Sequence, residues 1–245
     1  MNLQGKRALV TGASRGIGAA IAKKLAAEGA DVAITYEKSA ERAAEVVHEI
    51  RALGRRAVAI QADSAEVSAV QASVVKAVAE MGGLDILVNN AGTIRLADLN
   101  DMSVDDINSL LHINVRAPIV ASKAALSHLG TGGRIINTGS YFADRVPFSI
   151  VGIYATTKSA LISFTKGLAR EVGPRGITVN LVQPGPIDTD MNPSNGPYSS
   201  GQVQLTALGR YGKPEEIAAA VAFLSSSAAQ YITGTALTVD GGANA

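Results

Sequence analysis

The sequence predicts one doubly wound α/β domain, in which a seven-stranded parallel sheet is covered by helices on both faces. Short apolar runs alternate with longer helical patterns along the chain, and a glycine-rich turn joins the first apolar run to the first helical pattern. Alternation at this spacing implies right-handed crossovers, which place the strands in parallel. The length of 245 residues suits this class, so we expect residues 1–245 to form a single domain.

The expected strands and helices follow from apolar runs and from the residues that end them. Gly29 stands where a left-handed cap ends the first helix, and Gly54 ends the second. We expect strands at residues 8–10, 31–36, 57–61, 84–89, 134–138, 177–182 and 236–239. We expect helices up to residue 28 and at residues 39–53, 66–81, 103–129, 153–172 and 214–227.

Two stretches depart from this regular alternation. Pro118 lies within the helical pattern of residues 103–129, and a prolyl ring removes a hydrogen bond from the helix and restricts the preceding residue. We therefore expect two helices, or a kink around residues 114–117. Residues 184–208 are rich in Pro, Gly, Asn and Ser, and a loop of this length is usually a lid or disordered. We expect a mobile lid at about residues 186–208.

The composition excludes several classes of function. A net charge of +1 gives no indication of a nucleic acid or an anionic membrane as partner. The chain has no cysteine, which excludes disulfides and thiolate chemistry and agrees with a cytoplasmic protein. His48, His112 and His128 are scattered without metal-ligand spacing, so no metal site is expected. Neither a signal peptide nor an apolar run long enough to span a membrane is evident.

A tyrosine and a lysine four residues apart indicate a proton donor. Tyr154 and Lys158 lie in a helical pattern, so their side chains share one face, one turn apart. A fixed ammonium favours the phenolate, and we expect the pKa of Tyr154 to fall from ~10 toward neutrality. Such a tyrosine can protonate a carbonyl oxygen during reduction. Taken alone, the pair is more often an ordinary half-buried helix face.

The pattern Gly12-x-x-x-Gly16-x-Gly18 lies between a strand and a helix, which is the context of a dinucleotide-binding loop. Glycines permit a tight turn and let backbone N–H groups approach a pyrophosphate, whose charge the helix N-terminus favours. On its own, such a glycine loop is about as often a plain turn as a phosphate-binding site. The loop therefore indicates a dinucleotide site only together with the motifs that follow it in the sequence.

Taken together, the motifs resemble the short-chain dehydrogenase/reductase family, with a Rossmann fold. The resemblance extends from Lys6 to Gly242 and is closest to bacterial NADPH-dependent carbonyl and 3-oxoacyl-thioester reductases. The motifs are Thr11-Gly-Ala-Ser-Arg-Gly-Ile-Gly18, Asn89-Asn-Ala-Gly92, Asn114, Ser140, Tyr154-x-x-x-Lys158 and Pro184-Gly-x-Ile-x-Thr189.

The resemblance implies a catalytic role for four residues. Ser140 would hold the substrate carbonyl oxygen, and Tyr154 would protonate it while hydride arrives from the nicotinamide. Lys158 would hold the nicotinamide ribose hydroxyls and lower the tyrosine pKa. Asn114 would anchor a water that links Lys158 to solvent. Asn89, by contrast, is expected to be structural and to bridge central strands through its amide.

The resemblance also implies a cofactor site that draws on the glycine loop and on the segments after the later strands. Residues 90–92 would line the adenosine side, residues 184–189 would flank the carboxamide, and Asp63 would contact adenine, cap the next helix, or do both. The expected cofactor-binding residues are Gly12, Ser14, Arg15, Gly16, Ile17, Gly18, Tyr36, Lys38, Ser39, Ala62, Asp63, Ser64, Asn90, Ala91, Gly92, Tyr154, Lys158, Pro184, Gly185, Ile187 and Thr189.

The end of the second strand predicts NADP(H) over NAD(H). Enzymes that prefer NAD usually carry an acid there, and Tyr36 occupies that position. Arg15, with Lys38 and Ser39, could meet a 2′-phosphate, although ordinary surface charge is the alternative. Glu37 is expected to point to the other side of the chain.

The substrate pocket is expected outside the carboxyl ends of the fourth, fifth and sixth strands. Its predicted lining is apolar and suits a small-molecule ketone with hydrophobic substituents. Residues 129–133 lack the basic side chains of reductases that act on acyl carrier protein, although Arg134 and Arg175 remain, so that partner stays open. The expected substrate residues are Ile94, Tyr141, Phe142, Val146, Phe148, Ile150 and Met191.

Two classes of function stay open: an NADPH-dependent ketone reductase, and a regulatory protein that binds a nucleotide on the same fold with little or no turnover. Asn114, Ser140, Tyr154 and Lys158 together favour the enzyme, because a binding protein does not need them. The resemblance further implies a homotetramer. Residues 153–172 agree with this expectation, because they carry more apolar side chains than one sheet face needs: Ala155, Ala160, Leu161, Phe164, Leu168 and Ala169.

Overall fold

The computed structural model describes residues 2–245, and within them seven strands form one sheet. The spatial order is β3-β2-β1-β4-β5-β6-β7, and every neighbouring pair is parallel. This confirms the predicted doubly wound α/β class. The strands are β1 (Arg7–Val10), β2 (Asp31–Tyr36), β3 (Ala57–Gln61), β4 (Ile86–Asn89), β5 (Arg134–Thr138), β6 (Thr178–Pro184) and β7 (Ala236–Val239).

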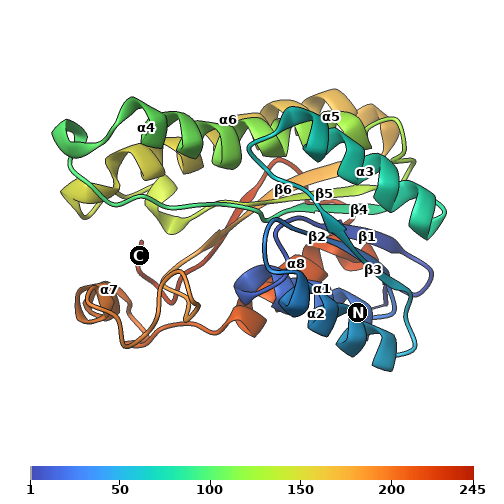
Figure 1. Ribbon diagram of the computed structural model, residues 1–245, viewed down its shortest axis with the longest axis horizontal. Coiled ribbons are helices and arrows are strands. Elements are labelled where there is room, and N and C mark those ends of the chain that lie inside the picture. The colour runs from blue at the N-terminus through green and yellow to red at the C-terminus, as the bar shows by residue number, and fades with distance from the viewer. Residues whose placement is uncertain (1) are drawn as a thin grey trace.

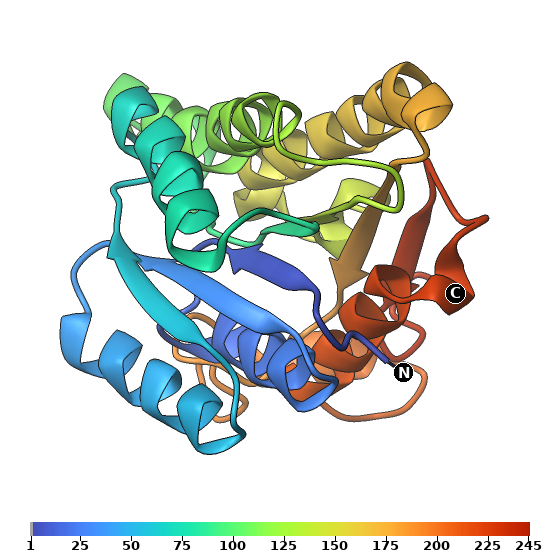
Figure 2. The same cartoon turned by 90° about the vertical axis from the view of Figure 1, so that its right-hand side faces the viewer.

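Helices cover both faces of this sheet, as Figures 1 and 2 show. One layer consists of α3 (Val67–Met81), α4 (Val104–Leu111), α5 (Ala117–Ala125) and α6 (Gly152–Val172). The other layer consists of α1 (Gly16–Ala27), α2 (Ala40–Ala52) and α8 (Pro214–Ser225). The short helix α7 (Ser199–Leu205) stands apart from both layers, beyond one end of the sheet.

The core is divided by the sheet because successive strand residues face opposite sides. Val10 and Ile34 pack in the cluster with α1, α2 and α8, whereas Leu9 and Ala33 pack in the cluster with α3, α5 and α6. All four are fully buried. Strands of this kind are apolar on both faces, which explains the short continuous apolar runs in the sequence.

The helical pattern around Pro118 is interrupted as predicted. A π-helical turn, His112–Arg116, lies between α4 and α5. Proline has no N–H, and its ring excludes the carbonyl four residues earlier, so a regular α-helix cannot continue through this point. A π turn accommodates the extra residue, and it turns Asn114 into the interior with no exposed surface.

The segment predicted to be an irregular loop and a mobile lid contains secondary structure. Strand β6 extends to Pro184, and α7 begins at Ser199. The side chains of Asn192 and Gln202 exchange two hydrogen bonds, at 2.9 and 3.1 Å, and Gln202 is only 8% exposed. The description as a loop without regular structure is therefore wrong, because pairing between side chains ten residues apart compensates for the scarcity of apolar groups. Its mobility stays a prediction.

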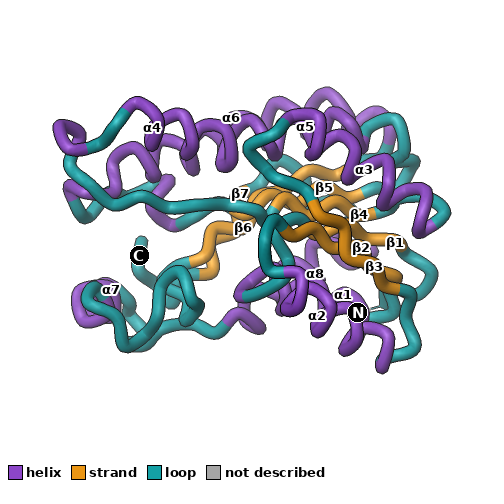
Figure 3. The backbone as a smooth tube through the Cα atoms, viewed as in Figure 1, coloured by secondary structure: helices purple, strands orange, loops and turns teal. Residues whose placement is uncertain are grey.

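Long connections gather at the carboxyl ends of the strands. Figure 3 shows loops beyond that end of the sheet, between the α4 and α6 layer and α7. The loops after β4, β5 and β6 therefore face the region where a doubly wound sheet binds its ligands. None of the helices within residues 2–245 has the length and apolar character needed to cross a membrane.

Candidate active site and cofactor cleft

One large cavity, of about 1310 Å³, occupies this end of the sheet. Its walls come from the segments that follow six successive strands, β1 to β6. Every residue that the sequence placed at the cofactor lies along it, and so do Ser140, Tyr154 and Lys158. The fold thus brings together predicted cofactor residues that are up to 177 positions apart in sequence, between Gly12 and Thr189.

The glycine loop fits a pyrophosphate. Gly12 and Gly16 have φ angles of 61° and 55°, in the left-handed region that favours glycine. A Cβ on Gly18 would lie 2.4 Å from Asn90 Nδ2, so only glycine lets the loop pack this closely. Helix α1 starts at Gly16, and among the described residues no side chain caps it and no acid lies in its first turn. Its free N–H groups and positive end suit an anion.

Two threonines hold this loop, and the sequence analysis gave neither a role. Thr11 Oγ1 accepts hydrogen bonds from the backbone N–H groups of Asn90 and Ala91, both at 3.0 Å. The Asn90 side chain donates to the carbonyls of Thr11 and Gly12, at 3.0 and 3.1 Å. Thr35 Oγ1 accepts from Gly12 N–H at 3.0 Å. The sequence offered one sign of this role: a threonine stands directly after β1, and another stands one residue before the end of β2.

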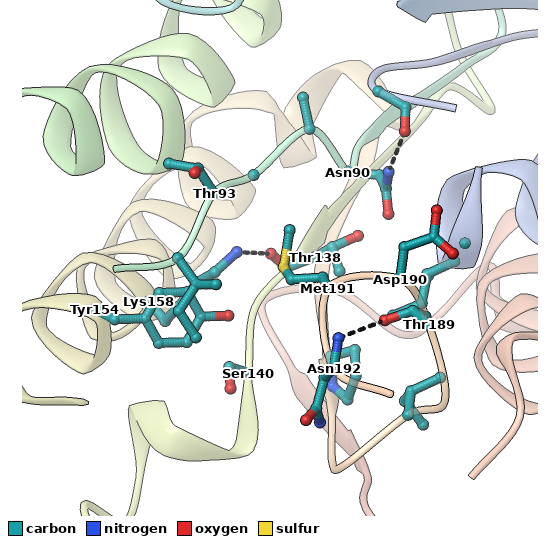
Figure 4. A pocket seen from close by; sticks show the side chains of 18 of the residues that line it. Asn90, Thr93, Thr138, Ser140, Tyr154, Lys158, Thr189, Asp190, Met191 and Asn192 are labelled. Atoms are coloured by element: carbon teal, nitrogen blue, oxygen red, sulfur yellow. Dashed lines mark hydrogen bonds between the residues drawn. The ribbon is translucent and has the colours of Figure 1, made fainter. Parts of the chain in front are cut away.

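The catalytic candidates face the same part of the cavity (Figure 4). Lys158 is 5% exposed, and its Nζ donates to the carbonyl of Thr138 at 3.0 Å. The same Nζ lies 5.7 Å from the centre of the Tyr154 ring. A Cβ on Gly92 would lie 3.5 Å from it, so this glycine leaves open the space in front of the ammonium.

The pKa values of the pair do not follow the sequence prediction. Burial raises the pKa of Tyr154 to about 12, although a hydrogen bond with Ser140 acts in the opposite direction. Burial lowers the pKa of Lys158 to about 8. The predicted fall of the Tyr154 pKa toward neutrality is therefore wrong for this structure. The lysine directs its Nζ to the Thr138 carbonyl, and desolvation of the phenolate dominates.

Asn114 connects the loop after β4 to helix α6 next to the site. Its Oδ1 accepts from Thr93 N–H, and its Nδ2 donates to the Thr93 carbonyl, both at 2.9 Å. Nδ2 also donates to Thr157 Oγ1 on α6 at 3.1 Å. Asn114 does not line the cavity, but its Oδ1 would lie 3.4 Å from a Cβ on Gly92. The expected water at this residue stays a prediction.

Asn89 bridges the central strands, as predicted from the sequence. Its Nδ2 donates to Asn137 Oδ1 on β5 at 2.9 Å and to Ser122 Oγ on α5 at 3.0 Å. Asn89 is 3% exposed, and Asn137 is fully buried. Its role is therefore to tie the sheet together beneath the cavity.

The adenosine end carries an ionic cluster that the sequence did not reveal. Asp190 pairs with Arg15, at 3.5 Å between Oδ2 and Nη1, and with the guanidinium of Arg42. The Arg42 hydrogen bond, more than Arg15, holds the pKa of Asp190 below its usual range. All three side chains are more than half exposed. Arg42 and Asp190 stand 148 positions apart, and no local signal links them.

Two smaller predictions at this end need correction. Glu37 was expected on the other side of the chain, yet it lines the cavity, and its carboxylate pairs with Lys38 Nζ at 2.8 Å. Asp63 was a candidate helix cap, but it accepts from Ala65 N–H at 2.8 Å, whereas the residue that precedes α3 is Glu66. It therefore closes the turn before the helix.

Aromatic and aliphatic side chains line the substrate end. Phe142 packs edge to face against Phe148 and Tyr154, with ring centres 6.2 and 6.3 Å apart. Val146 is wrongly predicted, because its side chain is 56% exposed and Pro147 lines the cavity instead. Neighbouring residues of an extended segment point in opposite directions, which the composition of the loop does not reveal. The other predicted residues line the cavity: Ile94, Tyr141, Phe142, Phe148, Ile150 and Met191.

Charge is scarce in the lining near the phenol. Arg15 is the one arginine among the described residues that line the cavity. Tyr198 and Gln202, which come from α7 and the residue before it, also line the wall and were missed. Among residues 2–245, no group of three or more His, Asp or Glu side chains could hold a metal ion. The arrangement can bind an elongated anionic nucleotide at one end and an apolar carbonyl compound at the other.

Known proteins are similar over the whole chain. The family described as enoyl-(acyl carrier protein) reductase matches residues 12–244. The cyclic-di-GMP-binding biofilm dispersal mediator protein of Escherichia coli is 44% identical over 237 residues, 97% of this chain and 96% of its own. The versicolorin reductase stcU of Emericella nidulans is 40% identical over 254 residues, 98% of this chain and 96% of its own.

Solved structures agree with this similarity. A short-chain dehydrogenase from Burkholderia cenocepacia, crystallised in complex with NADP, is 61% identical in sequence. It superposes with a TM-score of 0.99, and the match covers 100% of both chains.

Proposed function

The chain belongs to the short-chain dehydrogenase/reductase family, and we propose that it reduces a ketone to a secondary alcohol with NADPH, reversibly, using Tyr154 as the proton donor. The family makes it an oxidoreductase that uses a nicotinamide nucleotide. The observation that carries the proposal is the convergence of Ser140, Tyr154 and Lys158 on the apolar end of the cavity. The glycine loop lies at the other end, where an anionic nucleotide fits.

NADP(H) is the proposed cofactor, and when bound it supplies the hydride. The relative from Burkholderia cenocepacia holds NADP, and Tyr36 leaves the end of β2 without a carboxylate. The turn from Gly12 to Gly18 would hold the pyrophosphate. Arg15, with Lys38 and Ser39, would meet the 2′-phosphate, because an arginine fork matches phosphate oxygens.

The protein side chains would donate the proton, orient the carbonyl oxygen that receives it and stabilise the charge left on the donor. At neutral pH a phenol with a pKa of about 12 is protonated, so Tyr154 holds a proton ready for a carbonyl oxygen. The Ser140 hydroxyl would orient that oxygen by a hydrogen bond. Lys158, fixed by the Thr138 carbonyl, would place its ammonium beside the ribose hydroxyls. Its charge would stabilise negative charge as it develops on the phenol oxygen.

The proposed substrate is an apolar ketone with aromatic or aliphatic substituents. The wall around Phe142 and Phe148 favours such groups, and a versicolorin reductase is among the relatives. A docking site for acyl carrier protein is not supported by the two remaining arginines. Arg134 is 6% exposed, and Arg175 donates to the carbonyls of Leu126 and Leu129 at 2.6 and 2.8 Å. Arg134 is therefore held inside the fold, whereas Arg175 is exposed and uses one guanidinium nitrogen for these two bonds.

A panel of ketones tests this function. NADPH oxidation would be followed with acetophenone, benzil and an acetoacetate ester, with Tyr154→Phe as the matched control. We expect turnover of an aryl ketone by the wild-type protein and none by the variant. Equal rates in the two proteins, or no turnover of any ketone, would contradict the proposal.

The second candidate is a nucleotide-binding regulatory protein on the same fold. The observation that favours it is the 44% identity to a cyclic-di-GMP-binding protein. Calorimetric titration with cyclic di-GMP, in the presence and absence of NADPH, tests it. Binding of cyclic di-GMP together with no turnover of any ketone would favour this candidate over the enzyme.

A homotetramer in the cytoplasm is also proposed, on the family resemblance. The apolar side chains of residues 153–172 support it less than expected, because the chain itself buries four of the six: Ala155, Leu161, Leu168 and Ala169. Helix α6 packs on β6 and also contacts α4, the π turn His112–Arg116 and the 3₁₀ turn Tyr141–Ala143. Light scattering at micromolar concentration tests the assembly, and a mass of one subunit would exclude it.

A further inference from the structure

The residues after β7 form a closed turn, which we call the Asp240 turn (residues 240–244). The Asp240 carboxylate accepts hydrogen bonds from the backbone N–H groups of Gly242 and Asn244, both at 2.9 Å. Gly241 and Gly242 have φ angles of 65° and 79°, which this turn requires. The turn is therefore a defined structure. Figure 1 shows the chain ending between α6 and α7.

The Asp240 turn is bound to the residues that follow Ser140. Asn244 Nδ2 donates to the carbonyl of Tyr141 at 2.8 Å, and Arg145 Nη1 donates to the carbonyl of Ala243 at 2.9 Å. Ala243 is 1% exposed and packs in the cluster that contains Phe142. Two hydrogen bonds and one buried methyl group thus join the Asp240 turn to residues 141–145, and one of the bonds goes directly to the 3₁₀ turn Tyr141–Ala143.

A second chain of hydrogen bonds reaches Ser140 from the same strand, β7. Gln183 Nε2 donates to the carbonyl of Ser140 at 3.3 Å, and Gln183 Oε1 accepts from Thr238 Oγ1 at 3.2 Å. Gln183 has no exposed surface. The carbonyls of Ser140 and of the next residue, Tyr141, are therefore held by Gln183 on β6, which Thr238 on β7 supports, and by the Asp240 turn.

None of these supporting side chains lines the cavity in the part of the chain that the structure describes. Asn244, Arg145, Gln183 and Thr238 are all absent from its wall, whereas Ser140 is part of it. Any effect they have on the reaction must pass through the residues that do line it, and Ser140 and its neighbours Tyr141 and Phe142 are the ones they contact. The Ser140 hydroxyl is itself tied to this turn, because it accepts from Phe142 N–H at 3.2 Å.

We infer that Asn244 is a positioning residue, which holds the 3₁₀ turn Tyr141–Ala143 and thereby aims the Ser140 hydroxyl at the substrate carbonyl. Gln183 and Thr238 support the same serine from β6 and β7. This inference rests on the proposed ketone reduction for its effect on rate, but the structural link does not depend on it. A displacement of about 1 Å at a reacting group is enough to slow catalysis strongly.

Asn244→Ala tests the inference, with Asn100→Ala as the matched control at an exposed position outside the site. With benzil and saturating NADPH, we expect kcat to fall about tenfold in Asn244→Ala, because misplaced catalytic groups lose rate rather than binding. The KM for benzil and the Kd for NADPH should stay within about twofold of wild type. A kcat equal to that of Asn100→Ala would overturn the inference.

A double-mutant cycle separates positioning from general damage. If Asn244 acts through Ser140, then adding Asn244→Ala to Ser140→Ala should cause no further loss of rate. Losses that multiply in the double variant would show that Asn244 acts by another route and would overturn the inference.

Thr238→Val gives a second approach should Asn244→Ala fold poorly. It should lower kcat while Thr238→Ser restores it, and a Thr238→Val protein with wild-type kcat would count against the Gln183 support.

Hydrogen exchange tests the structural link without any turnover. The amides of residues 141–143 should exchange faster in Asn244→Ala than in wild type or in Asn100→Ala, with β-sheet amides unchanged. Unchanged exchange at residues 141–143 would overturn the inference even if the rate falls. If wild type turns over no ketone while exchange does change, the proposed function fails and the link stands.

Discussion

The two ends of the cavity are built in different ways. At the nucleotide end, buried strand ends and backbone groups form the wall, and Thr11, Thr35 and Asn90 fix it through hydrogen bonds of 3.0–3.1 Å. At the substrate end, the wall comes from 3₁₀ turns and from the segment that carries α7, where Met191 and Tyr198 are about half exposed. From this difference we predict a rigid site for a constant ligand beside an adaptable site for the variable one.

The phenol at the boundary of the two ends should give the largest effect. Tyr154→Phe removes the proton donor and leaves the ring that packs on Phe142. We expect turnover to fall at least a thousandfold, in the range of lost general-acid catalysis, with the Kd for NADPH nearly unchanged. Steady-state rates and a fluorescence titration with NADPH measure the two quantities. A variant that keeps more than about a tenth of wild-type turnover would remove Tyr154 from the acid role.

The buried lysine should lower stability in a pH-dependent way. The fall of the Lys158 pKa from 10.5 to about 8 corresponds to roughly 3 kcal/mol of stability lost while the amine is charged in both states. Because the folded pKa is the lower one, this loss is complete below pH 8 and disappears as pH rises toward 10.5. Lys158→Met should therefore raise the free energy of unfolding by about 1–2 kcal/mol at pH 7, since the lost Thr138 hydrogen bond offsets part of the gain. Urea unfolding at several pH values checks this, and a gain that grows above pH 8 would refute it.

A single methyl group should distinguish the rigid end from the adaptable end. A Cβ on Gly18 would lie 2.6 Å from the Gly12 carbonyl oxygen, whereas a Cβ on Gly201 in α7 meets nothing within 4 Å. Gly18→Ala should cost about 1–3 kcal/mol in stability and weaken NADPH binding. Gly201→Ala should gain about 0.5–1 kcal/mol through helix propensity. Thermal unfolding of both variants makes the comparison, and an equal response would show that the two ends are equally tolerant.

Cofactor preference should respond at the adenosine end. Tyr36→Asp places a negative charge where a 2′-phosphate would lie, and we expect NADPH efficiency to fall 10- to 100-fold, or roughly 1.4–2.8 kcal/mol. NADH efficiency should hold or rise. Arg15→Ala should weaken NADPH and leave NADH almost unchanged. Measurement of kcat/KM with both nucleotides tests these expectations. A wild-type protein that already prefers NADH would contradict them and would make Glu37 the residue to study.

The smallest effect is expected in the lid, residues 186–208. Its Asn192–Gln202 pair orders the segment, so the difference between the free and bound states should be modest compared with that of a disordered loop. We expect amide exchange in this region to be faster than in the glycine loop and to slow on addition of NADPH and a ketone. If the amides of residues 186–208 exchange as slowly in the free protein as those of residues 12–18, the predicted contrast between the two ends of the cavity is absent.

Local patterns in the sequence are enough to predict the sheet, the glycine loop and the spacing of Tyr154 and Lys158. These features depend on local patterns: apolar runs of strand length, glycines at a strand-to-helix turn, and one helical turn between two side chains. The interruption before Pro118 was predictable for the same reason, because a prolyl ring acts on its immediate neighbours. Parallel strands then bring their carboxyl ends to one edge, which explains why distant motifs meet at a single cavity.

The direction of the Tyr154 pKa shift, the exposure of Val146 and the burial of Leu161 and Leu168 depend on the packing of the whole chain. A pKa depends on how much water the fold removes and on where Lys158 points, and neither is a property of the four-residue spacing. A buried face depends on what packs against it. The links from Asp190 to Arg15 and from Asn244 to Tyr141 join residues more than 100 positions apart, and only the packing of the chain places such partners within hydrogen-bonding distance.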